Sequence, residues 1–187
     1  MKAITIGLMS CLIMLAVCGC EVTPKEPEDK AVLVAEVDEA IAVMKAKDPS
    51  IQEFFDKSYG YAMLPKIFKG AFIAGGAYGR GEVYEQGTRI GYCNMKQGSL
   101  GASIGTEYYR EIIFFEDKED LEKFKYEDFT FSAQITAVAL TWGKAAKTNY
   151  HSGMVVFIIT DTGMMGDVSV GGQKFNFEPT YVLRKVQ

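Results

Sequence analysis

The segment "FIAGGAYGRGEVYE", residues 72–85, has the residue types most able to do chemistry, because glycines beside a cation can bind a phosphate. A phosphate loop requires a strand, then glycines, then a helix whose N-terminus faces the anion. Here "GEVYE" follows, which is typical of a strand, and the Lys and Ser/Thr of a P-loop are missing. The spacing of Gly76, Gly79 and Gly81 also reverses the dinucleotide-binding order. We therefore expect these glycines to be architectural.

The glycines of this segment should form a row on one face of a strand, because side chains alternate across a strand. One face would contain Ala77, Gly79, Gly81 and Val83, and the other Tyr78, Arg80, Glu82 and Tyr84. Residues 99–106 alternate in the same way. Such bare rows let another element approach closely or let the sheet curl. The predicted structural glycines are Gly75, Gly76, Gly79, Gly81, Gly101 and Gly105.

Catalytic and metal-binding residue types are scarce in this chain. His151 is the only histidine, which excludes a metal site built on several histidines. A serine triad would also have to use this residue. The acids at positions 116, 117, 119 and 120 open a charged helix, where acids favour the N-terminus. We predict a non-enzymatic protein with no catalytic residue, no metal and no cofactor.

Basic residues cluster near aromatic residues between positions 60 and 100. The cations are Lys66, Lys69, Arg80, Arg89 and Lys96, against only Glu82 and Glu85. Phe68 and Phe72 flank the first two cations. This combination suits an anionic membrane surface, where each nearby cation contributes about 1 kcal/mol. The alternative is that the cations are solvated strand and turn charges, with both phenylalanines in the core.

The overall charge balance argues against a nucleic-acid surface. The net charge is −4, and from residue 40 onward the chain has 17 Lys and Arg against 17 Asp and Glu. The excess acids therefore lie near the N-terminus, and the remaining body is neutral. A strongly basic face for nucleic acid is not indicated, so no nucleic-acid partner is expected.

The first residues resemble a bacterial lipoprotein signal peptide. Lys2 precedes an apolar run over residues 3–17, which ends in "VCGC" and is shorter than the about 20 residues that span a bilayer. We expect residues 1–19 to be removed and Cys20 to be acylated, for example with palmitate. Residues 20–30 would form a flexible tether, and residues 31–187 the folded body. Cys93 would then have no disulfide partner and should be a buried apolar residue.

This interpretation places the protein in the cell envelope, anchored to a membrane through Cys20. Glutamate at position 21, rather than aspartate, favours the outer membrane in a Gram-negative organism. The body would then face the periplasm.

The remaining pattern predicts an α+β fold: N-terminal helices on a curled, largely antiparallel, glycine-rich sheet, with one short helix after Phe115. The first helix spans 31–47, with Val34, Val37, Ile41 and Met44 on one side, and Asp48 and Pro49 start a second helix. Strands follow from residue 60, with turns at residues 86–87 and 97–98. A short helix at 117–125 precedes strands at 154–160 and 164–172. Residues 129–147 are ambiguous, and strand is favoured for the first half.

Four motifs together resemble the SYLF domain family, in its bacterial lipoprotein branch. They are "GYAMLPKIFKGAFIAGGAYGRGEVYE", "GSLGASIGTEYYREIIFF", "FTFSAQITAV" and "GMMGDVSVGG", and the resemblance covers residues 31–172. It implies phospholipid binding; eukaryotic members bind phosphoinositides, and some fungal members bind actin. Neither of these ligands suits a bacterial envelope, so anionic phospholipid is the expected substitute.

We therefore expect a membrane-anchored, non-enzymatic lipoprotein whose body binds anionic phospholipid or a hydrophobic ligand. The headgroup contacts would be the five cations named above, and the apolar contacts Phe68 and Phe72. The alternative is an envelope scaffold that binds another protein and touches lipid only through its acyl anchor. Salt dependence separates these hypotheses, because headgroup binding weakens with salt and an apolar protein interface does not.

Overall fold

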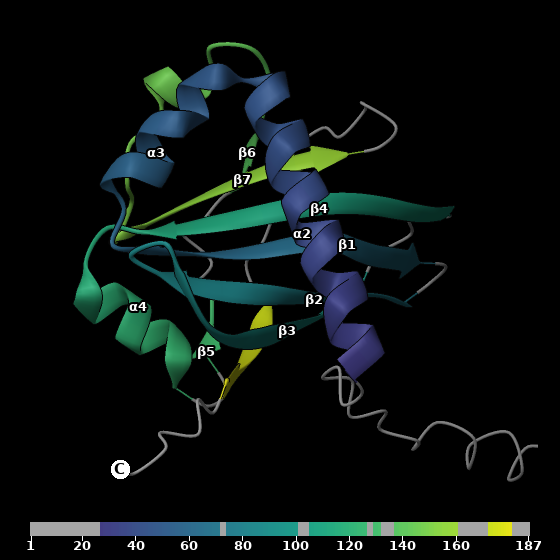
Figure 1. Cartoon of the computed structure of the whole chain (residues 1–187). Helices are drawn as coiled ribbons and strands as arrows, with labels where there is room; N and C mark the ends of the chain where they lie inside the picture. The colour runs from purple at the N-terminus through teal and green to yellow at the C-terminus, as the bar shows by residue number, and fades with distance from the viewer. Residues whose placement is uncertain are drawn as a thin grey trace, which may run out of the picture.

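The described part of the chain folds into one curled sheet with helices on it, which confirms the predicted α+β class (Figure 1). The computed structural model describes residues 27–71, 74–100, 105–126, 129–131, 137–160 and 172–180. The strand order is β5-β8-β3-β2-β1-β4-β7-β6. All neighbouring strands are antiparallel except β6 and β7, which are parallel. The strands are β1 (Gly60–Ala71), β2 (Ala74–Glu85), β3 (Thr88–Leu100), β4 (Gly105–Phe115), β5 (Phe129–Thr130), β6 (Val138–Ala139), β7 (Met154–Thr160) and β8 (Lys174–Pro179).

Helix α2 (Pro27–Lys47) crosses the outer face of the sheet, and its residues Leu33, Val37, Ala40 and Met44 are buried against it (Figure 1). The helix begins four residues before the predicted start. Residues 27–30, which we expected to belong to the tether, are helical instead. The polar composition that resembles a tether also suits a first helical turn, because Pro27 fits the N1 position and acids favour a helix N-terminus. Val34 and Ile41, predicted on the buried side, are only half-buried.

Asp48 anchors the corner between α2 and the following helices, η2 (Pro49–Ile51) and α3 (Gln52–Lys57). As predicted, it caps the new helix, accepting hydrogen bonds from the Ser50 amide at 3.1 Å and the Ser50 hydroxyl at 2.7 Å. It also accepts one from the distant Ala145 amide at 2.8 Å, in helix η3 (Ala145–Lys147). Burial raises the pKa of this carboxyl, but these hydrogen bonds outweigh that effect and lower it.

Replacing Asp48 with alanine should lower the free energy of unfolding by about 2–4 kcal/mol, because it removes a cap and leaves the buried Ala145 amide without an acceptor. Urea unfolding at pH 7 measures the change. Asp56→Ala, at an exposed site in α3, is the matched control and should change stability far less. Equal losses in the two variants would contradict the anchoring role.

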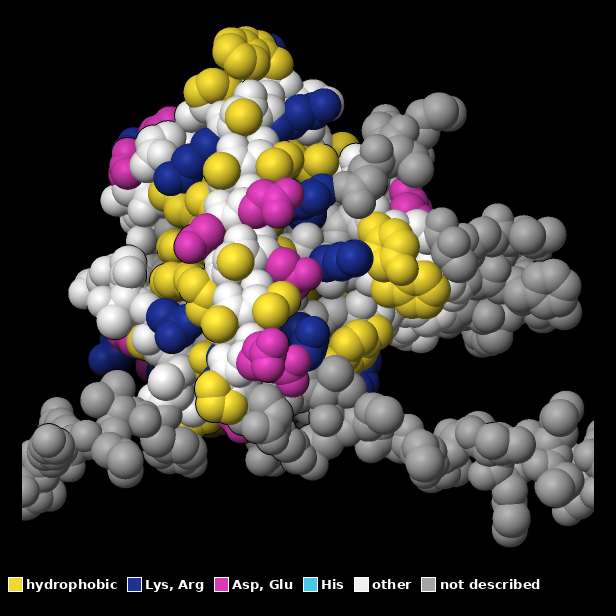
Figure 2. Space-filling view, turned by 45° about the vertical axis from the view of Figure 1, so that its right-hand side comes forward, with side chains coloured by type: hydrophobic (Ala, Val, Ile, Leu, Met, Phe, Trp, Pro, Cys, Tyr) yellow, Lys and Arg dark blue, Asp and Glu magenta, His cyan; other side chains and the backbone are white. Residues whose placement is uncertain are grey.

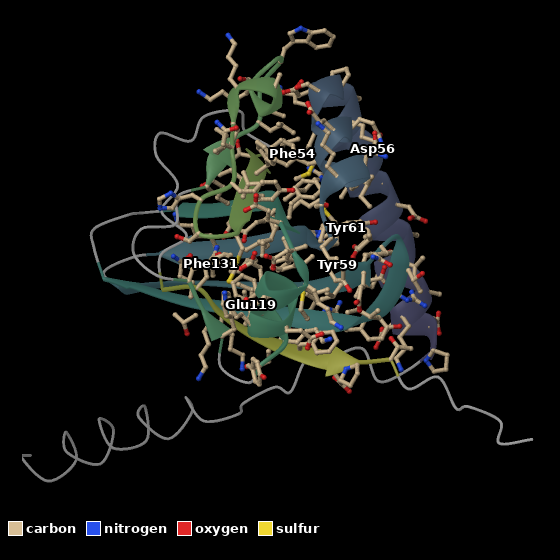
Figure 3. All side chains as sticks on the ribbon, turned by 90° about the vertical axis from the view of Figure 1, so that its left-hand side faces the viewer. Phe54, Asp56, Tyr59, Tyr61, Glu119 and Phe131 are labelled. Carbon is tan, nitrogen blue, oxygen red and sulfur yellow. The ribbon has the colours of Figure 1, made fainter. Side chains whose placement is uncertain are left out.

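The two faces of the sheet belong to two hydrophobic clusters. Phe54 and Tyr61 lie between the helices and the sheet, whereas Phe131 belongs to the cluster on the opposite, inner face (Figure 3). Helix α4 (Lys118–Lys125) closes one end of the inner cluster with Leu121 and Phe124. Its N-cap is Asp117, which accepts a hydrogen bond from the Asp120 amide at 3.1 Å, as the charged pattern predicted.

The glycine row lies on the inner face, and Ala77, Gly79, Gly81 and Val83 are all buried there. A Cβ at Gly79 would lie 2.6 Å from Ile67 Cγ1, and one at Gly81 would collide with the Met63 carbonyl oxygen. These glycines therefore let β1 and β2 approach as the sheet curls. Gly76 differs, since a Cβ there would be at an ordinary 3.4 Å from Gln97 O. Gly75 lies in β2 and Gly105 in β4, but the surroundings of these two residues are not described. Gly101 lies outside the described residues.

One predicted turn is wrong and another is confirmed. Gln86 and Gly87 form the β2–β3 turn with φ values of 48° and 76°. Residues 97–98 instead continue β3, where Gly98 pairs with Gly76. The dipeptide Gln97–Gly98 is typical of a turn, but the long partner strand β2 supplies the hydrogen bonds that keep it extended. Of residues 129–147, short strands form at 129–130 and 138–139, and 132–136 lie outside the described part.

Candidate functional site

The outer face of the sheet is covered by helices over only part of its length (Figure 1). Under α2 and α3 this face is largely apolar and includes Met63, Tyr92 and Phe114, with the buried Glu82 among them. The register of β1 shifts between Met63 and Lys66. Beyond that bulge no described helix covers the outer face, and its side chains reach solvent.

Two cross-strand rows cross this uncovered part. The first row runs Tyr108, Phe68, Tyr78, Lys96 and Lys174, and the second runs Lys66, Arg80, Asn94 and Asn176. Their inner-face neighbours along the strands are buried, among them Ile67 and Met95. Neighbouring strands lie about 4.8 Å apart, so the first row is about 19 Å wide. We call Lys66, Phe68, Tyr78, Arg80, Lys96, Tyr108 and Lys174 the basic–aromatic face; the two rows that hold them contain no Asp or Glu.

Phe68 and Tyr108 form the apolar part of the basic–aromatic face. Both are 42% exposed, which is unusual for large aromatic side chains, and their ring centroids are 5.3 Å apart. Lys66 Nζ lies 5.0 Å from the Tyr108 ring centroid. Phe68 is thus not a core residue. Tyr108 was not among the site residues that the sequence predicted. Alternation in "TEYYRE" makes one of the two adjacent tyrosines face outward, but only the pairing of β4 with β1 places Tyr108 beside Phe68.

The structure brings Lys66, Arg80 and Lys96 together but separates the other two predicted cations from them. Lys69 alternates to the inner side, in the same cross-strand pair as buried Ala77. Arg89 lies at the other end of β3, where its guanidinium is 2.6 Å from the fully buried carboxylate of Glu82. Arg89 therefore lies apart from the other predicted headgroup cations, and its charge is already paired with Glu82. Phe72 and Cys20 lie outside the described residues.

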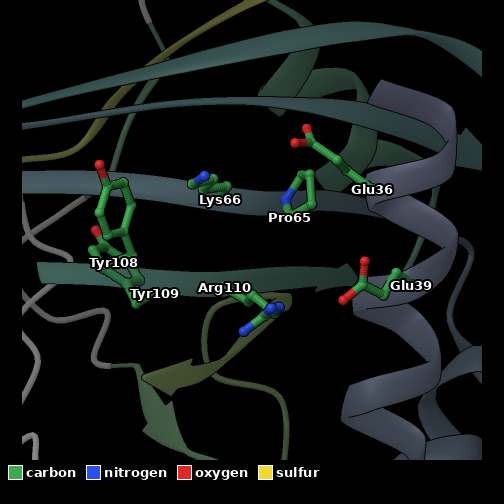
Figure 4. A pocket seen from close by; sticks show the side chains of 7 residues that line it. All are labelled: Glu36, Glu39, Pro65, Lys66, Tyr108, Tyr109 and Arg110. Atoms are coloured by element: carbon green, nitrogen blue, oxygen red, sulfur yellow. The ribbon is translucent and has the colours of Figure 1, made fainter. Parts of the chain in front are cut away.

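A charged pocket of about 190 Å³ lies where α2 meets the basic–aromatic face (Figure 4). Its helix wall bears Glu36 and Glu39, and its strand wall bears Lys66 and Arg110, with Pro65, Tyr108 and Tyr109 completing the lining. Figure 2 shows the same arrangement on the surface, with acidic side chains beside lysines, arginines and exposed hydrophobic groups. The pocket therefore presents opposite charges on facing walls.

A buried polar pair lies inside the curled sheet. Glu111 is fully buried and accepts a hydrogen bond from Gln173 Nε2 at 3.0 Å, while its Oε1 has no protein partner. Burial raises the pKa of this carboxyl to about 7, although the hydrogen bond from Gln173 opposes the shift. Cys93 is a free, buried thiol, as predicted, and burial raises its pKa.

The described ranges contain neither a metal-binding cluster nor a membrane-spanning helix. No group of three or more His, Cys, Asp or Glu residues there could hold a metal ion. Among the helices that the structure describes, none combines the length and apolar character needed to cross a membrane.

The fold and the site define a helix-covered, curled-sheet domain with an exposed basic–aromatic face. Residues 96–180 match the family described as "Ysc84: Las17-binding protein actin regulator". The chain is also 27% identical over 139 residues to "Beta cell expansion factor A" of Aeromonas veronii, covering 74% of this chain and 53% of the relative. It thus spans about half the length of this curated relative. The predicted resemblance to the SYLF, or Ysc84, family is confirmed over residues 96–180, the segment that matches the family.

Proposed function

We propose that this protein is a non-enzymatic, membrane-anchored lipoprotein whose SYLF-type body binds anionic phospholipid through the basic–aromatic face. The observation that carries the proposal is the exposed pair Phe68 and Tyr108, set among cations in rows that contain no acid. Acyl chains on Cys20 would supply the anchoring, and the face would add a weaker contact. A single weak membrane signal binds reversibly, and two together bind stably.

The composition of the face matches the chemistry of a bilayer surface. Lys66, Arg80 and Lys96 would meet lipid phosphates, each contributing about 1 kcal/mol on an anionic leaflet. Tyr108, whose ring has one apolar and one polar end, suits the interfacial region, and the apolar ring of Phe68 would leave water beside it. The attraction between exposed charges is screened at high ionic strength, so the contact should be sensitive to salt.

Vesicle flotation of residues 21–187 tests this proposal without any acyl chain, and this fragment retains every described helix and strand. The variant Lys66→Glu/Arg80→Glu/Lys96→Glu should bind vesicles containing phosphatidylglycerol roughly 100-fold more weakly, since it removes about 3 kcal/mol of attraction. Wild-type binding should require anionic lipid and decline at high salt.

The matched control is Lys118→Glu/Lys144→Glu/Lys147→Glu, which changes the net charge equally at exposed sites outside the two rows. It should retain most of the binding. No wild-type flotation, or equal losses in the two triple variants, would contradict the proposed face. In that case the scaffold alternative would stand, with Cys20 as the membrane contact and a protein partner on the exposed aromatic pair.

A further inference from the structure

The charged pocket contains two acids, Glu36 and Glu39. A site that bound only lipid phosphates would be weakened by these negative charges. Glu36 and Glu39 are three residues apart in α2, so both project toward the strands from one side of the helix (Figure 4). Among the described residues, neither carboxylate has a hydrogen-bond or ion-pair partner. They border a face that is otherwise basic, and they would repel an anionic lipid approaching the pocket.

The facing wall supplies the complementary charge. Lys66 follows the β1 bulge, and Arg110 lies on the adjacent strand β4. A guanidinium and an ammonium at one wall suit a phosphate group, which arginine can bind with two parallel hydrogen bonds. A volume of about 190 Å³ is several times the ~30 Å³ share of one water molecule, so the pocket has room for a headgroup rather than one small ion.

On these grounds, and resting on the proposed function, we infer that this pocket binds the zwitterionic headgroup of a phosphoethanolamine lipid. The phosphate would lie against Lys66 and Arg110, and the primary ammonium would donate hydrogen bonds to Glu36 and Glu39. The opposite charges on the two walls match the opposite charges at the two ends of this headgroup.

The chemistry of the walls favours a primary ammonium over a quaternary one. Quaternary ammonium groups are bound by cages of aromatic ring faces. Of the two tyrosines that line the pocket, Tyr109 is buried and Tyr108 already has the Lys66 ammonium 5.0 Å from its ring centroid. Two carboxylates instead offer hydrogen-bond acceptors, which a primary ammonium can use and a trimethylated one cannot. The pocket should therefore discriminate ethanolamine from choline.

The first arm of the test uses soluble compounds and residues 21–187. Glycerophosphoethanolamine should bind at least tenfold more tightly than glycerophosphocholine in a calorimetric titration. The variant Glu36→Gln/Glu39→Gln should lose this preference. Glu28→Gln/Asp38→Asn, which removes two charges from exposed sites in the same helix, should keep it. Equal binding of the two compounds, or an undiminished preference in Glu36→Gln/Glu39→Gln, would overturn the inference.

The second arm uses vesicles and separates this inference from the proposed function. At constant phosphatidylglycerol, replacing phosphatidylcholine with phosphatidylethanolamine should increase flotation of the wild type and not of Glu36→Gln/Glu39→Gln. That variant should still float on anionic vesicles, because the basic–aromatic face is intact. Flotation that needs anionic lipid but ignores ethanolamine would overturn the inference alone. Loss of all anionic-vesicle binding in the wild type would overturn the proposed function as well.

Discussion

Replacing Gly81 with alanine is expected to lower the free energy of unfolding by about 3 kcal/mol, at the upper end of ordinary overpacking penalties. The added Cβ would collide with the Met63 carbonyl oxygen and carbon, which are backbone atoms in the adjacent strand. A backbone cannot rotate away as a side chain can, so β1 and β2 would have to separate. Urea unfolding, followed by circular dichroism, measures the loss.

Gly98→Ala is the matched control, because Gly98 also lies in a central strand but a Cβ there would meet nothing within 4 Å. Its stability should be unchanged or raised by up to about 1 kcal/mol, since alanine restricts the unfolded chain. Gly79→Ala should lose an intermediate amount of stability, because the added Cβ would lie 2.6 Å from Ile67 Cγ1, which belongs to a side chain. A Gly81→Ala variant as stable as Gly98→Ala would refute the close approach of the strands.

Glu111→Gln is expected to stabilise the protein at pH 8 by about 3 kcal/mol relative to its effect at pH 4. The folded-state pKa of about 7 lies above the ordinary value of 4.5, so the folded protein binds more protons than the unfolded chain between these values. Wild-type stability from this group is therefore full below pH 4.5, decreases as the pH rises through this window, and is lost above about 7. Glutamine does not ionise and should abolish this decrease.

Urea unfolding at several pH values between 4 and 8 measures the difference between the wild type and Glu111→Gln. The glutamine can also donate to Gln173 Oε1, which has no protein partner in the wild type. Glu116→Gln, at an exposed site just after the same strand, should give a curve parallel to the wild type. Parallel curves for Glu111→Gln as well would show that the buried carboxyl is not protonated at neutral pH in the folded state.

Several local features were predictable because neighbouring residues decide them. The helix starts at Asp48 and Asp117 were recognised, since a cap acts on amides two or three residues away. The inner glycine row followed from the alternation of one strand. The same local reasoning failed at two places. The polar residues 27–30 suit a tether as well as a first helical turn, and the dipeptide at 97–98 suits a turn as well as a strand.

The composition of the candidate site depended on contacts that local patterns do not specify. Lys66, Arg80 and Lys96 share a face only because the registers of β1, β2 and β3 align them. The sequence groups Lys69 and Arg89 with them. Strand alternation instead directs Lys69 to the inner side, and Arg89 forms an ion pair with Glu82. The placement of Tyr108 beside Phe68 likewise depends on the pairing of β1 with β4.

Short-range periodicity and an ordered set of motifs were enough to predict the fold class, the resemblance to the SYLF family, the helix starts and the buried glycine row. Long-range contacts instead specify which cations lie together, that Tyr108 is exposed, that Glu111 is buried, and that two acids of α2 face two bases of the sheet. Strand register, the β1 bulge and helix docking create these contacts by joining residues far apart in the chain. Those contacts are selected by packing of the whole core and not by any local segment.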